Sequence, residues 1–246
     1  LNPFESRSSQ NVIYKGNPGL TPTFTNSFDL GYLQKIGKLT LNSSIYFQHS
    51  INSILRVSRD EIRLLDGVNQ VIVIREPINL ASEDGFGFEL TANYNPSKKV
   101  RLSGSFNVYQ QESKGLYAYN KFTIDEITGA ISATPETQDL GNTNNSWFTR
   151  FNATFSLPWK TQMQNRLSYR GPRNTAQSES EGIFSANIAL SKDVFKEKAS
   201  LVLNVSDLFN SRKSKSTNYN PSIESPTSIS YQESQWRVRQ VSLNFT

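Results

Sequence analysis

Residues 86–94 read FGFELTANY, and this stretch decides the fold. Its apolar members are Phe86, Phe88, Leu90, Ala92 and Tyr94, and the intervening positions hold Gly, Glu, Thr and Asn. Because successive side chains of a β-strand point to opposite faces, this period of two predicts a strand with one apolar and one polar face.

The same alternation recurs along almost the whole chain, and no helical period competes with it. The further segments are Phe24–Tyr32, Leu39–Phe47, Leu102–Val108, Trp147–Leu157, Met163–Tyr169, Phe184–Leu190, Leu201–Val205 and Val241–Phe245. We therefore predict an all-β protein with nine strands.

The connections between these segments alternate in length. Short links span 34–38, 95–99, 158–160 and 195–198, whereas longer ones span 49–84, 113–145, 171–182 and 210–230. In an antiparallel sheet, short and long links then gather at opposite ends. Long strands with this asymmetry are typical of an antiparallel transmembrane β-barrel in the outer membrane of a Gram-negative bacterium, with tight periplasmic turns and extended external loops.

Lipid gives a physical reason for the pattern. Hydrocarbon offers no hydrogen-bond partners, so a spanning sheet must close and each strand must turn one face to lipid. Aromatic residues near the strand ends then suit the interfacial girdles: Tyr32, Tyr94, Trp147, Trp159 and Tyr169. The alternative is a soluble β-sandwich, in which the same residues form an ordinary core.

Composition excludes several other classes. The longest purely apolar runs are four residues, Val71–Ile74 and Leu116–Tyr119, far short of the roughly 20 that a spanning helix needs. The chain has 15 Phe, 10 Tyr and 3 Trp, too many aromatic residues for a disordered protein. Its net charge of +5 is scattered along the chain, so we expect no nucleic-acid partner.

We also expect no enzyme activity, catalytic residue, metal site or cofactor. Zero cysteines exclude disulfides and thiolate chemistry, and there is a single histidine, His49. A His–Ser pair needs hydrogen-bond contact, but His49 and Ser50 are neighbours in an alternating segment and are expected to point apart.

The strand count bears on domain organisation. Single-chain bacterial barrels have an even number of strands. A count of nine therefore suggests that residues 1–246 are the C-terminal part of a larger barrel and that they begin within an external loop. We accordingly expect no signal peptide in this chain. The alternative is a complete barrel of about eight or ten strands, for example with Asn11–Tyr14 as an extra strand.

Local motifs add a resemblance to a known family. The segment Gly16-Asn17-Pro18-Gly19-Leu20-Thr21-Pro22, followed by an alternating strand, resembles the "GNPxLxPE" motif of TonB-dependent receptors and related outer-membrane β-barrel proteins. Further landmarks of that family follow in the same order, namely Tyr169-Arg170-Gly171-Pro172 and Val205-Ser206-Asp207-Leu208-Phe209-Asn210. Two features depart from the pattern: Thr23 replaces the usual Glu, and the chain ends at Thr246 without the terminal aromatic residue.

The resemblance implies a twenty-two-stranded barrel whose plug domain, absent from this chain, precedes it. It also implies energised uptake of a scarce solute, with TonB as partner if a plug exists upstream. The alternative is a receptor-like barrel that does not transport and serves as a structural subunit of a larger outer-membrane complex. Other expected partners are membrane lipid, lipopolysaccharide and a companion lipoprotein.

Three groups of residues are candidates for function. Glu89, Arg101, Arg150 and Arg166 fall on polar faces, where they would line the lumen, hold a plug or simply form a solvated wall. Tyr117, Tyr119 and Phe122 lie in a long loop, where they would stack on a ligand or pack one loop on another. The basic loop residues Arg212, Lys213 and Lys215 would meet an anionic partner or solubilise the loop.

Overall fold

The computed structural model describes residues 1–246 except 1–3, 10, 66, 126, 197 and 225. Nineteen strands are assigned within the described residues. No helix among those residues has the length and apolar character needed to cross a membrane.

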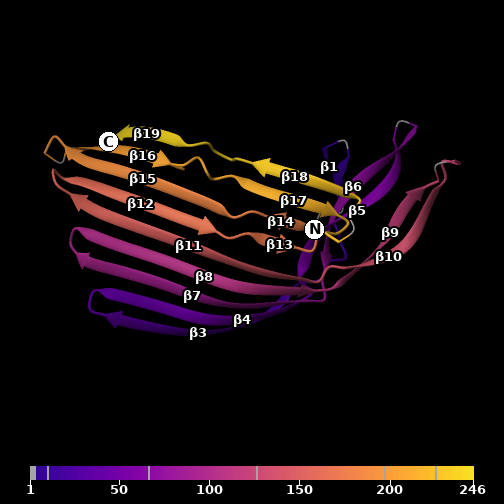
Figure 1. The fold of residues 1–246 in the computed structure, drawn as a ribbon, viewed down its shortest axis with the longest axis horizontal. Helices are drawn as coiled ribbons and strands as arrows, with labels where there is room; N and C mark the ends of the chain where they lie inside the picture. Colours follow the sequence, from indigo (N-terminus) through magenta and orange to yellow (C-terminus); the bar gives the residue numbers. More distant parts are fainter. Residues whose placement is uncertain (1–3, 10, 66, 126, 197, 225) are drawn as a thin grey trace.

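Nine strands form the main sheet, in the order β19-β16-β15-β12-β11-β8-β7-β4-β3 (Figure 1). Their bounds are β3 (Phe24–Ile36), β4 (Leu39–Ile51), β7 (Ser82–Ser97), β8 (Val100–Lys114), β11 (Asn142–Leu157), β12 (Thr161–Arg170), β15 (Ile183–Val194), β16 (Ala199–Ser206) and β19 (Gln240–Phe245). All neighbouring pairs are antiparallel. Each strand contains one of the nine predicted segments, so that prediction is confirmed.

The nine strands do not close on one another. Within the described residues, β3 and β19 each pair with a single neighbour in this sheet. The main sheet would form part of a barrel wall, and completion of that wall by further strands stays a prediction. The alternative use of Asn11–Tyr14 as a wall strand is wrong, because β2 (Val12–Tyr14) pairs in parallel with β6 (Val68–Asn79) in another sheet.

The expectation of simple extended loops is also corrected. The four longer links fold into hairpins: β5 (Ile54–Leu65) with β6, β9 (Leu116–Ile124) with β10 (Ile131–Asp139), β13 (Arg173–Thr175) with β14 (Ser178–Ser180), and β17 (Ser214–Asn220) with β18 (Ser228–Ser234). A short strand β1 (Ser6–Ser9) pairs with β2. These hairpins pack on each other rather than on lipid, so their side chains do not follow the strict apolar–polar alternation of the wall.

The main sheet therefore has two different ends, as expected. Its turn end carries the four short links, and its loop end carries the hairpins (Figure 1). The buried apolar residues lie among the hairpins, in two clusters: Val57, Leu80, Tyr117 and Leu140, and Ile13, Ile72 and Ile74.

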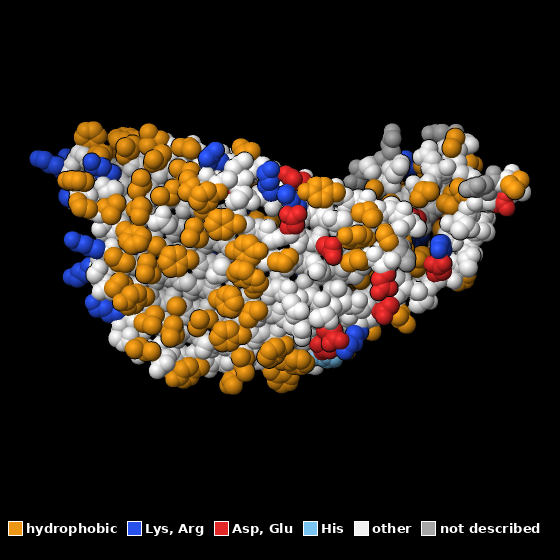
Figure 2. Space-filling model, viewed as in Figure 1, with side chains coloured by type: hydrophobic (Ala, Val, Ile, Leu, Met, Phe, Trp, Pro, Cys, Tyr) orange, Lys and Arg blue, Asp and Glu red, His pale blue; other side chains and the backbone are white. Residues whose placement is uncertain are grey.

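One face of the main sheet is apolar and uncovered (Figure 2). Phe151 lies on β11, the central strand of the nine, and is still 41% exposed. Among the described residues no second sheet covers this face, so the β-sandwich alternative is wrong. The apolar stretch Phe86–Tyr94 extends about 26 Å at about 3.3 Å per residue, of the same order as the roughly 25 Å lipid-facing band of outer-membrane barrels.

Aromatic rings border the apolar face near the loop end. Trp147 contacts Tyr169 with ring centroids 4.5 Å apart and Phe106 at 6.2 Å. The amide of Gly171 donates to the carbonyl of Trp147 at 2.7 Å, and a Cβ at Gly171 would lie 3.1 Å from that carbonyl oxygen. Because glycine has no Cβ, the strand end lies close to this aromatic row.

Candidate functional site

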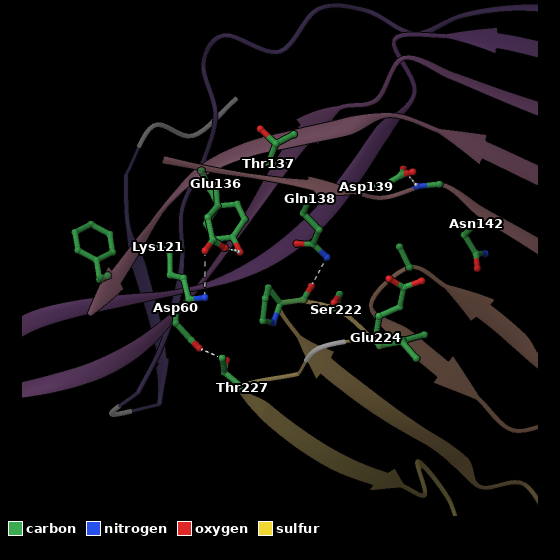
Figure 3. A pocket seen from close by; sticks show the side chains of 16 residues that line it. Asp60, Lys121, Glu136, Thr137, Gln138, Asp139, Asn142, Ser222, Glu224 and Thr227 are labelled. Atoms are coloured by element: carbon green, nitrogen blue, oxygen red, sulfur yellow. Dashed lines mark hydrogen bonds and ion pairs between the residues drawn. The ribbon is translucent and has the colours of Figure 1, made fainter. Parts of the chain in front are cut away.

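Three hairpins at the loop end supply most of the lining of a pocket of about 630 Å³ (Figure 3), and Ala176 of the β13–β14 hairpin completes it together with Gly141 and Asn142. One wall comes from β9 and β10, another from the link between β17 and β18, and Asp60 of β5 joins them. Small-molecule sites commonly have volumes of about 300–1,000 Å³. The pocket is therefore large enough for a small organic ligand.

A carboxylate, an ammonium group and a phenol meet on the β9–β10 wall. Glu136 accepts hydrogen bonds from Nζ of Lys121 at 3.1 Å and from the hydroxyl of Tyr119 at 3.2 Å. Burial and then the hydrogen bond to the Glu136 carboxylate raise the pKa of Tyr119. Tyr119 therefore remains a neutral hydrogen-bond donor at physiological pH.

The opposite wall is fixed by hydrogen bonds between hairpins. Asp60 accepts from the hydroxyl of Thr227 at 2.6 Å and from the side-chain amide of Asn220. Gln138 donates to the carbonyl of Pro221 at 2.6 Å, while its own Oε1 has no partner among the described residues. The side-chain oxygen of Gln138 is thus a buried acceptor without a partner among the described residues.

The lining is acidic overall. Four carboxylates, one ammonium group and two aromatic rings line it: Asp60, Glu136, Asp139 and Glu224, with Lys121, Tyr119 and Phe122. Glu224 has no hydrogen-bond or ion-pair partner among the described residues. This combination suits a ligand that offers hydroxyl or amino donors to carboxylates and a flat surface to the rings. No group of three or more potential metal ligands occurs among the described residues.

The sequence located only part of this pocket. Tyr119 and Phe122 line it, whereas Tyr117 is 7% exposed in an apolar cluster and packs one hairpin on another. Glu136 and Gln138 were missed because their segments were expected to be loops. A hairpin signal was present in Asp66-Gly67, a favourable turn dipeptide whose Gly67 has a φ of 81°; Asp66 itself lies outside the described residues.

The four candidates for a lumenal wall all lie on the polar face of the main sheet but do not form one site. Glu89 accepts from Asn107 at 2.6 Å, and Arg166 donates to Asn152 at 3.1 Å. Arg150 lies over the ring of Phe148 at 5.3 Å, and Arg101 borders a depression near the turn end. Their lumenal role remains a prediction.

Two of the three basic loop candidates are paired with carboxylates. Lys213 lies 3.0 Å from Glu233, and Lys215 lies 3.7 Å from Glu181. Arg212 borders a polar depression on the sheet, apart from the loop pocket. The structure therefore does not bring these three cations together.

The His49–Ser50 pair has no catalytic geometry. His49 Nδ1 lies 2.6 Å from Oδ1 of Asp84, whereas the hydroxyl of Ser50 shares a 2.8 Å hydrogen bond with that of Thr25. The two side chains thus contact different partners.

The motif residues near the N-terminus build a turn against β6. The side chain of Asn17 accepts from the amide of Gly19 at 2.9 Å and donates to the carbonyl of Pro77 at 3.1 Å. Gly16, Pro18, Leu20 and Pro22 belong to the same segment. Thr23, at the position that departs from the motif, donates to the carbonyl of Asn52 at 2.9 Å.

The second motif closes a loop after β16. The buried carboxylate of Asp207 accepts from the amides of Ser211 and Arg212, each at 3.0 Å. Asn210 accepts from the amide of Arg239 at 3.0 Å, and Phe209 contacts Phe184 with ring centroids 6.0 Å apart. Both motifs thus have structural roles.

Comparison with known proteins agrees with this architecture. The model of the outer membrane protein beta-barrel family matches residues 1–246. No curated protein and no solved structure matches the chain. With its apolar face, unequal sheet ends and full-length match, the chain belongs to the outer membrane protein beta-barrel family and resides in the outer membrane of a Gram-negative bacterium.

Proposed function

We propose that this protein is a receptor-like barrel that takes up a scarce solute across the outer membrane with energy supplied through TonB. The loop pocket of about 630 Å³ is the observation that carries the proposal. A ligand captured there from outside would then pass along the polar face of the main sheet, which carries Glu89, Arg150 and Arg166.

Coupling to TonB requires a plug domain, which we place elsewhere in the protein. External capture by the hairpins would then precede opening of the lumen by TonB. The sequence motifs around Asn17 and Asp207 support kinship with such receptors. A companion lipoprotein over the loops is compatible with this arrangement.

The test compares solute accumulation by cells that carry the wild-type protein with accumulation by cells that carry the Thr137→Trp variant. Thr137 lines the pocket and is exposed, so an indole at this position fills the cavity. The matched control is Ala130→Trp at the exposed tip of the same hairpin, outside the pocket. We expect accumulation of one small-solute class to fall at least ten-fold in Thr137→Trp and to remain unchanged in the control.

Collapse of the inner-membrane proton gradient should stop accumulation in cells with the original protein. Cells from which this protein has been deleted test the alternative. If they take up every solute normally but fail to form another outer-membrane assembly, the structural-subunit alternative replaces this proposal.

A further inference from the structure

The turn end of the main sheet carries a concentrated positive charge. Its short links and the adjoining strand ends hold nine cations: Lys35, Lys38, Lys98, Lys99, Arg101, Lys160, Lys192, Lys196 and Lys198. The same segments contain two carboxylates in the sequence, Asp193 and Glu197, of which Glu197 lies outside the described residues. Blue side chains project from this edge in Figure 2. We call these nine cations the basic rim.

Part of the basic rim lies on the lipid-facing side. Lys192 continues the apolar row of β15 and is paired with Leu201, which in turn is paired with Phe245. No hydrogen bond or ion pair joins the Lys192 side chain to a described residue. A lysine at the border of an apolar face extends its amine toward water and headgroups while its methylene chain stays on the apolar surface.

Exposed aromatic rings lie beside these cations. Phe195 is 71% exposed, and its ring meets that of Phe245 edge-on with centroids 6.4 Å apart. Trp159, in the neighbouring short turn, is 82% exposed. Aromatic rings of this kind concentrate where hydrocarbon gives way to headgroups, which places Lys192 and the turn that holds Lys196 near headgroup level.

Both short turns place the ring and the lysine that follows it in a left-handed backbone conformation. Trp159 and Phe195 have φ values of 58° and 52°, in the left-handed region that glycine or asparagine adopts more easily. Each ring is followed directly by a lysine, Lys160 and Lys196.

We propose that the lipid-facing part of the basic rim, Lys192 and Lys196 beside Phe195, is a binding site for the phosphate group of an anionic phospholipid. The lipid belongs to the leaflet at the turn end of the sheet. The two ammonium groups neutralise the headgroup charge, and the rings of Phe195 and Phe245 pack on its upper acyl chains. The site lies at the opposite end of the molecule from the loop pocket and does not depend on transport.

Native mass spectrometry of the full-length protein in detergent tests the proposal, with phosphatidylglycerol and phosphatidylethanolamine added at equal concentration. We expect phosphatidylglycerol to be retained preferentially. A basic residue near an anionic surface contributes about 1 kcal/mol, so Lys192→Gln and Lys196→Gln should each lower phosphatidylglycerol affinity about five-fold.

Arg101→Gln is the matched control, because Arg101 lies at the same end but on the polar face of the sheet. It should leave lipid selection unchanged. Equal retention of the two phospholipids by the original protein, or equal effects of Arg101→Gln and Lys192→Gln, would overturn the proposal. Stronger retention of lipid A than of phosphatidylglycerol would also reject it, since the lipid would then come from the opposite leaflet.

Discussion

The hydroxyl of Tyr117 donates a hydrogen bond to Oε1 of Glu76 across 2.8 Å, and this contact joins hairpin β9–β10 to hairpin β5–β6. The ring of Tyr117 stacks on that of Tyr119 with centroids 5.4 Å apart and planes 11° apart. A buried residue thereby positions a ring that lines the pocket.

Removal of this hydroxyl should loosen the pocket without unfolding the wall. Hydrogen bonds to charged groups contribute about 1.5–3 kcal/mol, and Tyr117→Phe leaves one oxygen of Glu76 without that donor. We expect faster hydrogen exchange in β9 and β10 and unchanged exchange in β11. Tyr231→Phe is the control, because its hydroxyl lies 3.4 Å from Glu233 at an exposed site; equal effects of the two substitutions would contradict the assigned role.

Adjacent positions on β7 test which face meets lipid. Leu90 lies at the centre of the apolar stretch 86–94, and Thr91 lies on the polar face. A lysine at the bilayer midplane costs about 2–4 kcal/mol, so Leu90→Lys should lower folding stability in lipid vesicles by that amount and Thr91→Lys by much less. The measurement is urea-dependent unfolding. A larger effect at Thr91 would reverse the assignment of the two faces.

Asp207 should stabilise the loop that follows β16. Asp207→Ala leaves the amides of Ser211 and Arg212 without their acceptor, at a cost of about 1–3 kcal/mol. Asp207→Asn retains one carbonyl oxygen and should lose less, and asparagine also tolerates the φ of 52° at this position. The urea midpoints of the two variants check this order; midpoints equal to that of the wild-type protein would show that the carboxylate has no such role.

Residues 4–9 should loosen in acid, because Glu5 ties this segment to Arg63 of β5. Hydrogen bonds from Arg63 lower the pKa of Glu5 despite partial burial. Burial opposes ionisation of Glu61, but Arg63 and Arg59 together lower its pKa below 4.5. A lowered folded-state pKa gives stability that is present above the unfolded value, near 4.5, and is lost as the pH falls through the folded value.

Proteolysis of residues 4–9 should therefore accelerate as the pH falls from 7 to 3.5, measured with an acid-tolerant protease and normalised to an unstructured peptide. The Arg63→Gln variant should be cleaved quickly at both pH values and should lose most of the pH dependence of cleavage. An Arg63→Gln profile that parallels the original protein would refute the ionic tether.

The wall strands were predictable because each obeys a single local constraint. Phe86 and Phe88 face hydrocarbon while Gly87 and Glu89 do not, so alternation identifies them without any knowledge of neighbours. Val57 and Ile72 obey no such rule, since they are buried between hairpins whose positions depend on contacts distant in the chain. Their strands were therefore missed.

The sequence by itself determined the class of fold, the number of wall strands, the unequal ends and the outer-membrane location, because the requirement to separate lipid from water is imposed on every second residue. Tertiary structure alone decided the pocket. Asp60, Gln138 and Thr227 come from three hairpins, and their proximity arises from hydrogen bonds between hairpins, such as that of Thr227 to Asp60, which no local pattern encodes.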